Sequence, residues 1–499
     1  MSLRPSVVVL ATLVACTGLV GCANGAVDSR PGATMVPTVT DGPSSATSAT
    51  PSAAPGIDAA VAGATRVTFI AQPEGVDATS LRFDKARNLS EAGEVVRDKM
   101  LRDGWFRDAS HVQVRSDVVA SSDSVLGVTV KGVRTVKGVE ETTYSSLWYS
   151  TASKQTYSSP ALVRPDQWKA LGAALATAAK ADGRDVTKLP ALLAAAAAPY
   201  GNAPALSFAS DGDLVATFST GTLAKDAATV ELPAEKVTPL LSTFGAHAQQ
   251  AAMSPSAFTG ATKVAVDPLV KPVATRPSTA VGPDCRVVHC VAVTYDDGPS
   301  AMTPTLLASL KKAQVPASFF QMGKSIKEYP AIARQVAASG MEVGSHTVTH
   351  PPLTTVTPER VKQEVSGNAE LIKGFTGASP LLFRPPYGDH NAKVDAIVAE
   401  QGQAIMQWEV DTNDWKSHNV NSTIQIASSA KAYKSTIVLE HDVQAASIDA
   451  APSIYANLKA AGVTMVTVSE LSLNSGGYQP GHAYCRGRSM PQQGFNCKG

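Results

Sequence analysis

Two adjacent carboxylates, Asp296 and Asp297, follow the apolar run of residues 291–294. Carboxylates at the end of a buried strand cost free energy to desolvate unless a bound group compensates for it. About fifty residues further on, His346 and His350 lie four positions apart, a spacing that predicts two imidazoles on one face of a helical turn. One aspartate and two histidines suit a divalent metal with an open coordination position. We therefore expect Asp297, His346 and His350 to bind a metal, which leaves Asp296 free to act as a base.

Three further polar clusters each follow a short apolar run: RPPYG at residues 384–388, DTNDW at 411–415 and LEHD at 439–442. Active sites of parallel α/β barrels form at the carboxyl ends of the strands, where such clusters would meet. Each cluster alone has a simpler interpretation as a turn, a helix cap or a hydrogen-bonded pair. All the clusters together, in this order and each after a strand-like run, favour an active site.

These segments resemble the motif set of the NodB-like polysaccharide deacetylases, carbohydrate esterase family four, over about residues 285–475. Two positions depart from the family pattern without removing a reacting group: Tyr295 stands where phenylalanine is more usual, and Glu440 fills the variable place before His441. Strand-like segments also alternate with helix-like ones, as a parallel sheet with crossover helices requires. We expect strands at 291–295, 317–321, 341–344, 381–383, 404–408, 436–439 and 464–468, and helices at 303–313, 329–339, 358–375, 392–401, 423–433 and 451–461.

The resemblance implies a role for each site residue. Asp297, His346 and His350 would be the metal ligands, with zinc expected first and cobalt or nickel as alternatives. Asp296 would be the general base that activates the attacking water, and His441 the general acid that protonates the leaving amine. The remaining implied roles are orientation of the base by Arg384, charge relay to His441 by Asp414, oxyanion stabilisation by the backbone N–H of Tyr387, and walls of the substrate groove from Pro385, Trp415 and Leu439.

The predicted function is hydrolysis of N-acetyl groups from a cell-wall polysaccharide, with peptidoglycan N-acetylglucosamine or N-acetylmuramic acid expected first. The same motifs also serve deacetylases and esterases of chitin, surface polysaccharide or acetylxylan, so these substrates stay open. A non-catalytic wall-binding or sensing lipoprotein is a third possibility, which the intact acid and base disfavour. The net charge of +1 gives no reason to expect a nucleic-acid partner.

The first residues predict export. Arg4 is the only charge before an apolar stretch, residues 7–20, and the four residues ending in Cys22 resemble a bacterial lipobox. We expect lipidation at Cys22, which would anchor the protein to the outer face of the cell membrane, facing the wall. An ordinary cleaved signal or an uncleaved anchor is the alternative, although the apolar run is short for a membrane span.

Four cysteines remain outside the signal: Cys285, Cys290, Cys485 and Cys497. Outside the membrane, disulfides are the expected state of such cysteines. Four cysteines allow three pairings, and both local pairing (Cys285 with Cys290, Cys485 with Cys497) and the crossed pairings remain open. A zinc cluster is less favoured because no Cys-x-x-Cys spacing occurs.

The chain divides into several parts by composition and pattern. The expected fold class is α/β, a distorted (β/α)7 barrel catalytic domain preceded by a smaller α+β domain. The smaller domain has no catalytic cluster and faintly resembles the extracytoplasmic domain of some anti-sigma factors, which implies a wall-sensing, wall-binding or spacing role. The predicted parts are a lipoprotein signal at 1–22, a flexible Ser/Thr/Pro/Ala tether at 23–63, the α+β domain at 64–253, a linker at 254–283, the deacetylase domain at 284–475 and a C-terminal tail at 476–499.

Overall fold

The computed structural model describes residues 56–194, 204–266 and 278–488. The predicted signal, its lipidation site Cys22, most of the tether and Cys497 lie outside these residues. Among the described residues, no helix combines the length and the apolar character that a membrane span needs.

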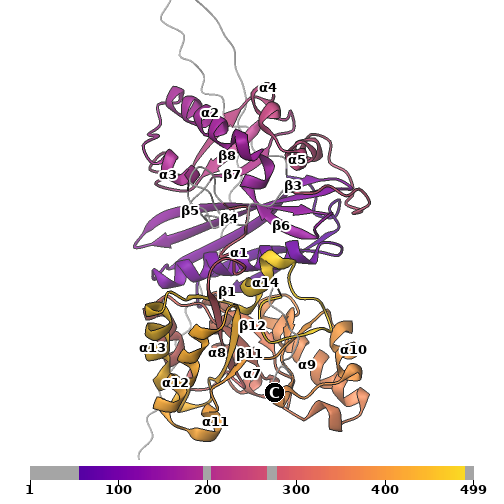
Figure 1. Cartoon of the computed structure of the whole chain (residues 1–499), viewed down its shortest axis with the longest axis vertical. Helices are drawn as coiled ribbons and strands as arrows, with labels where there is room; N and C mark the ends of the chain where they lie inside the picture. The colour runs from indigo at the N-terminus through magenta and orange to yellow at the C-terminus, as the bar shows by residue number, and fades with distance from the viewer. Residues whose placement is uncertain (1–55, 195–203, 267–277, 489–499) are drawn as a thin grey trace, which may run out of the picture. The chain divides into compact units, whose positions relative to one another are not determined.

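The N-terminal region is built on a six-stranded sheet with one long helix, α1 (Arg87–Phe106), against one face (Figure 1). The strands pair in chain order, antiparallel except for β2 with β3, which α1 connects as a parallel crossover. Alternating apolar residues of β3 and β4, such as Val114 and Val130, pack with Val96 of α1. The strands are β1 (Ala64–Ala71), β2 (Val76–Phe83), β3 (His111–Ser121), β4 (Val125–Val136), β5 (Val139–Ser150) and β6 (Gln155–Ser158).

A second core includes Trp148 of β5, in contact with Phe208 of a smaller antiparallel sheet. This sheet comprises β7 (Ala205–Phe208), β8 (Leu214–Phe218) and β9 (Ala228–Leu232), and the helices packed with it are α2 (Trp168–Ala181), α3 (Leu189–Ala194), α4 (Ala234–Val237) and α5 (Thr243–Met253). The α+β class is thus confirmed. Residues 234–253 form two helices and not one: α4 and α5 are separated by a 3₁₀ turn containing Pro239, and Ser242 caps α5 by accepting a hydrogen bond from the N–H of Gly245.

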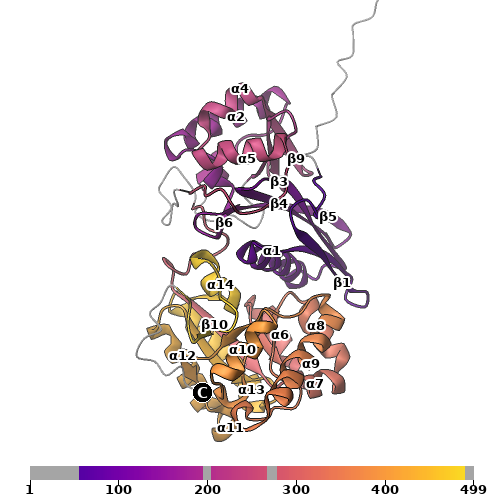
Figure 2. The same cartoon turned by 90° about the vertical axis from the view of Figure 1, so that its right-hand side faces the viewer.

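The C-terminal region holds a curled, parallel sheet with helices around it (Figure 2). The order is β15-β16-β10-β11-β12-β13-β14-β18, with β17 paired to β10, and the path is open at its two edges. All seven predicted strands are present, and the expected α/β distorted barrel is confirmed. The strands are β10 (Cys290–Asp296), β11 (Ser318–Gln321), β12 (Glu342–Ser345), β13 (Leu382–Phe383), β14 (Ala404–Met406), β15 (Val410–Asp411), β16 (Thr436–His441), β17 (Thr464–Val466) and β18 (Ala483–Tyr484).

All six predicted helices are present, although the ends of several differ from the predicted ones. The helix predicted from residue 451 begins at Ala445, so Pro452 lies in its interior. Tertiary contacts of the added turns, such as that of Ser447 with Asp414, offset the cost of the internal proline. The short helices α7, α11 and α14 were not predicted. The helices are α6 (Thr303–Ala313), α7 (Gly323–Glu328), α8 (Pro330–Ala338), α9 (Pro358–Thr376), α10 (Ala392–Glu400), α11 (Asp414–Ser417), α12 (Val420–Ser429), α13 (Ala445–Ala460) and α14 (Val468–Ser472).

Strand β10 is buried along its whole length, as expected for a parallel strand covered on both faces. Val291, Val293 and Tyr295 belong to the core formed with the outer helices. The Tyr295 hydroxyl lies 2.6 Å from the Tyr455 hydroxyl of α13, and Glu440 of β16 is the register partner of Tyr295. The alternating residues of β10, which include Asp296, therefore face the interior of the curled sheet.

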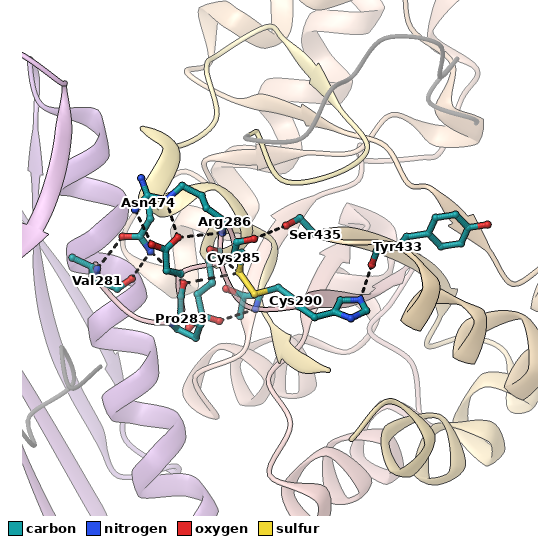
Figure 3. The surroundings of a disulfide bond; sticks show 12 residues. Val281, Pro283, Cys285, Arg286, Cys290, Tyr433, Ser435 and Asn474 are labelled. Atoms are coloured by element: carbon teal, nitrogen blue, oxygen red, sulfur yellow. Dashed lines mark hydrogen bonds and ion pairs between the residues drawn. A yellow bond between two sulfur atoms is a disulfide. The ribbon is translucent and has the colours of Figure 1, made fainter. Parts of the chain in front are cut away.

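A disulfide joins Cys285 to Cys290 immediately before β10, so these two cysteines pair locally (Figure 3). The Ser435 hydroxyl donates a hydrogen bond of 3.1 Å to the Cys285 carbonyl, and His289 Nε2 lies 2.8 Å from the Tyr433 carbonyl. These contacts connect the start of β10 to the start of β16. Cys485 is disulfide-bonded as well.

Candidate active site

The site residues come from the carboxyl ends of neighbouring strands. Asp296 ends β10 and His441 ends β16, and the two are register partners. His346 directly follows β12, and Arg384 directly follows β13. Parallel strands present their carboxyl ends at one edge of the sheet, so four segments distant in sequence contribute side chains to one place.

Asp297, His346 and His350 converge as a possible metal site. One ligand atom from each lies within 4.8 Å of the others. Asp297 Oδ1 is 3.4 Å from His346 Nε2 and 3.3 Å from His350 Nε2, yet it is buried and has no hydrogen-bond partner of normal geometry among the described residues. A buried, orphaned carboxylate oxygen facing two imidazole nitrogens fits a divalent cation, with two nitrogen ligands and one oxygen ligand.

The protonation states of this trio also suit a cation. The His346 Nδ1–H donates a 2.7 Å hydrogen bond to the Arg384 carbonyl, which leaves Nε2 as the free lone pair. Burial and the neighbouring His346 lower the pKa of His350, which favours its neutral form. Burial opposes ionisation of Asp297, but the surrounding imidazoles, His346 foremost, hold the pKa of Asp297 well below its usual range.

The helical turn predicted for the two histidines is wrong. Residues 346–350 form a loop in which Thr347 and His350 adopt left-handed backbone conformations, with φ of 63° and 64°. The Thr347 hydroxyl accepts a hydrogen bond from the His350 N–H at 3.1 Å. The loop brings the two imidazoles to a centroid distance of 4.9 Å. The two histidines, four residues apart, are therefore brought together by a tight loop and not by a helix.

Asp296 is held by a buried arginine. Arg384 is fully buried, and its Nη1 donates hydrogen bonds to Asp296 Oδ1 at 2.7 Å and to the Thr294 hydroxyl at 2.8 Å. Its guanidinium carbon lies 4.0 Å from the centre of the Phe320 ring. These contacts fix the direction of the Asp296 carboxylate, whose second oxygen lies 3.9 Å from His346 Nε2.

His441 and Asp414 form a hydrogen-bonded pair. The His441 Nδ1–H donates to Asp414 Oδ1 at 2.8 Å, and the His441 backbone N–H donates to Asp414 Oδ2 at 2.9 Å. The Ser447 hydroxyl donates to Asp414 as well. Burial disfavours the imidazolium, but the hydrogen bond and the charge of Asp414 outweigh it and raise the pKa of His441 to about 9. His441 is therefore protonated at neutral pH, with Nε2–H available as a proton donor.

The residues expected to line a groove differ in exposure. Trp415 is 50% exposed, whereas Leu439 and Pro385 are buried. Tyr387, which was expected to act through its backbone N–H, is 62% exposed. Tyr387 has a left-handed φ of 61°, and its ring meets the His350 ring edge-on with 4.6 Å between centroids. Asp411 Oδ1 accepts the Asn413 N–H at 2.8 Å, so this aspartate forms a turn while Asp414 holds His441.

The family model described as "Polysaccharide deacetylase" matches residues 284–406. A peptidoglycan-N-acetylglucosamine deacetylase from Bacillus cereus is 32% identical over 186 residues, which cover 36% of this chain and 67% of that protein. The chain belongs to the polysaccharide deacetylase family.

Longer relatives match this chain over part of their length. The peptidoglycan-N-acetylglucosamine deacetylase PgdA of Listeria monocytogenes is 35% identical over 190 residues, which are 38% of this chain but only 40% of that protein. The peptidoglycan-N-acetylmuramic acid deacetylase PdaC of Bacillus subtilis is 34% identical over 38% of this chain and 40% of its own. A solved structure of a family 4 carbohydrate esterase from Streptomyces lividans is 31% identical, covers 38% of this chain and 96% of its own, and has a TM-score of 0.36.

Several residues of the deacetylase site were not found from the sequence. Ser447 and Thr294 carry no motif signal, because their roles depend on contacts across the sheet. Asp442 could have been noticed, since it adjoins His441. Its carboxyl accepts the Thr303 hydroxyl at 2.5 Å and lies against Gly298, where a Cβ would stand 2.1 Å from Asp442 Oδ1. The glycine of the Asp-Asp-Gly-Pro motif is therefore required by this close approach.

Proposed function

We propose that this deacetylase hydrolyses N-acetyl groups of cell-wall peptidoglycan, at N-acetylglucosamine or N-acetylmuramic acid residues, with zinc at the Asp297, His346 and His350 site. The observation that carries the proposal is the arrangement of a buried base and a protonated acid at the ends of the paired strands β10 and β16. Amide hydrolysis needs both groups, because the nitrogen must be protonated before it can leave.

The chain's own residues account for the proton transfers. Asp296, oriented by Arg384, takes a proton from the attacking water. His441, held by Asp414, gives its Nε2 proton to the leaving nitrogen, so that the C–N bond breaks to acetate and a free amino sugar. The backbone N–H of Tyr387 is proposed to stabilise the oxyanion. A divalent metal bound at the trio would polarise the amide carbonyl and acidify the attacking water.

Two observations support a polymeric sugar substrate from the wall. The relatives described above carry peptidoglycan deacetylase in their names. The exposed rings of Tyr387 and Trp415 offer flat apolar surfaces with polar edges, which suit a sugar ring.

The proposed location is the outer face of the cell membrane, through a lipid on Cys22. The support is the apolar run ending in a lipobox-like tetrapeptide, followed by a Ser/Thr/Pro/Ala-rich segment that could reach into the wall. Labelling growing cells with a radioactive fatty acid tests this: the label should enter the wild-type protein and be absent from Cys22→Ala.

The test of the activity is acetate release by the purified, zinc-loaded protein. Peptidoglycan, N-acetylglucosamine oligomers and acetylxylan are supplied separately, with the Asp296→Asn variant as the control for background hydrolysis. Acetate from peptidoglycan that the variant does not release is the expected result. Release from oligomers or acetylxylan alone would overturn the peptidoglycan assignment, and no release from any substrate would overturn the enzymatic one.

A further inference from the structure

Helix α9 lies beside the loop that carries the two histidine ligands, and two of its buried polar residues bind that loop. We propose that Glu364 and Asn368 are positioning residues that hold the loop in its metal-binding conformation. The inference rests on the proposed metal site and extends it to residues outside the family motifs described above.

Glu364 is 1% exposed, and its carboxylate accepts hydrogen bonds from the loop. Its Oε2 accepts the backbone N–H groups of Val348 and Thr349, both at 2.8 Å, and its Oε1 accepts the Thr349 hydroxyl at 2.6 Å. Arg360, one turn earlier on α9, lies 2.5 Å from Glu364 Oε1. These donors fix the orientation of the Glu364 carboxylate, because charge-assisted hydrogen bonds are among the strongest in proteins.

Asn368 occupies the next turn of the same helix face and binds the start of the loop. It is fully buried, and its Nδ2 donates to the Ser345 hydroxyl at 2.9 Å and to the Gln321 carbonyl at 2.8 Å. Ser345 immediately precedes the ligand His346. Glu364 and Asn368 are four residues apart and therefore lie on the same face of α9. Asn368 binds the residue before His346, and Glu364 binds two residues that follow it.

The opposite side of the loop is also fixed. The carbonyls of Thr347 and Val348 accept the backbone N–H groups of Gly323 and Lys324 at the start of α7, each at 2.9 Å. A Cβ on Gly367 of α9 would stand 3.2 Å from the Val348 side chain, so helix and loop are closely packed. The loop therefore has N–H groups bound by α9 and carbonyls bound by α7.

The loop needs this support because of its backbone. Left-handed conformations at Thr347 and His350 are uncommon for residues with a Cβ and persist only where the surroundings determine them. Without the Glu364 carboxylate, the N–H groups of Val348 and Thr349 would lose the acceptor that fixes their direction. We infer that the loop would then relax and move the imidazoles apart, which lowers metal affinity before it unfolds the domain.

The experiment is a zinc titration of the metal-free chain against a coloured chelator, combined with thermal melting of the metal-free form. Glu364→Ala should weaken zinc binding about 10- to 100-fold, the range typical for loss of a group that orients a metal ligand. Glu364→Gln, which keeps the shape and one acceptor oxygen, should recover part of the affinity. The matched control is Glu370→Ala, because Glu370 lies on the same helix with its side chain 66% exposed, and it should bind zinc as the wild type does.

Each outcome decides between a positioning role, a structural role and failure of the metal site. If the Glu364→Ala variant folds and binds zinc as tightly as the wild type, the positioning role is overturned but the metal site is not. This holds whether or not the melting temperature of the variant is lower. If Glu364→Ala does not fold, Thr349→Val removes only the hydroxyl that donates to Glu364, and a wild-type affinity in that variant would overturn the role. A wild-type chain that binds no zinc would overturn the proposed metal site and this inference with it.

Discussion

Replacing Asp414 by asparagine should remove the main support for the protonated form of His441. Asparagine keeps the size of the side chain and can still accept the backbone N–H of His441, but it removes the negative charge beside the imidazole. The pKa of His441 should therefore fall from about 9 toward or below its ordinary value of 6.5.

The size of the effect follows from that pKa. A histidine whose pKa is raised in the folded state contributes stability that is fully present below about pH 6.5 and is lost as the pH rises through 9. At pH 7 the contribution is about 2 to 3 kcal/mol, and at pH 10 it is close to zero. His441 is only 12% exposed, so solvent screening reduces this value little.

The assay is urea unfolding of the metal-free wild type and Asp414→Asn at pH 7 and at pH 10. The variant should lose about 2 to 3 kcal/mol more of its unfolding free energy at pH 7 than at pH 10. Any cost of the changed hydrogen bond to Ser447 appears at both pH values and cancels in the comparison. In the zinc-loaded enzyme, the alkaline limb of the profile of kcat/KM against pH should move to lower pH. An equal loss of stability at both pH values, or an unmoved alkaline limb, would refute the reasoning.

Four further substitutions test other parts of the site. Asp296→Asn should abolish acetate release while zinc still binds, whereas His346→Ala should lose both, as measured by zinc stoichiometry and turnover. Gly298→Ala should lower kcat/KM by about tenfold or more, because its Cβ would displace the Asp442 carboxyl and shift the adjoining metal ligand. Tyr387→Gly should retain kcat within about tenfold and raise KM, since glycine adopts a φ of 61° readily and keeps the N–H but loses the ring.

Each of these expectations has a contrary result. Turnover with zinc bound in Asp296→Asn would remove this residue from the role of base. Normal activity in Gly298→Ala would show that the Asp442 carboxyl can move at little cost. A loss of kcat in Tyr387→Gly with an unchanged KM would assign the side chain, and not the backbone N–H, to the transition state.

The sequence predicted the seven main strands well because each combines a short apolar run with a polar cluster at its carboxyl end. The sequence also predicted that three side chains meet in space: Asp297, His346 and His350. The reason is that parallel strands end at one edge of the sheet. The loop geometry of the two histidines could not be predicted, because a spacing of four residues fits both a helix and the tight loop found here. Register between strands far apart in sequence, such as that of Tyr295 with Glu440, depends on the assembled sheet.

Helix α9 shows a signal that sequence reasoning could have used. Its buried face is formed by residues at helical spacing, and two of them, Glu364 and Asn368, are polar within an otherwise apolar stripe. Polar residues on such a stripe need partners inside the protein. Their position was predictable from periodicity, but their partners were not, because the loop that supplies them is defined only by the tertiary structure.

The alternation along β10 and β16 divides each strand into a face that performs chemistry and a face that only packs. Tyr295 and Glu440, the two departures from the family pattern, both lie on the packing face, where Glu440 is buried without a hydrogen bond of normal geometry among the described residues. Burial raises the pKa of Glu440 well above its usual range, so it is held neutral. Glu440→Leu should therefore leave turnover intact while stability stays equal or rises, because an apolar side chain replaces a neutral buried carboxyl. A substitution on the packing face of either strand leaves the reacting side chains on the other face in place.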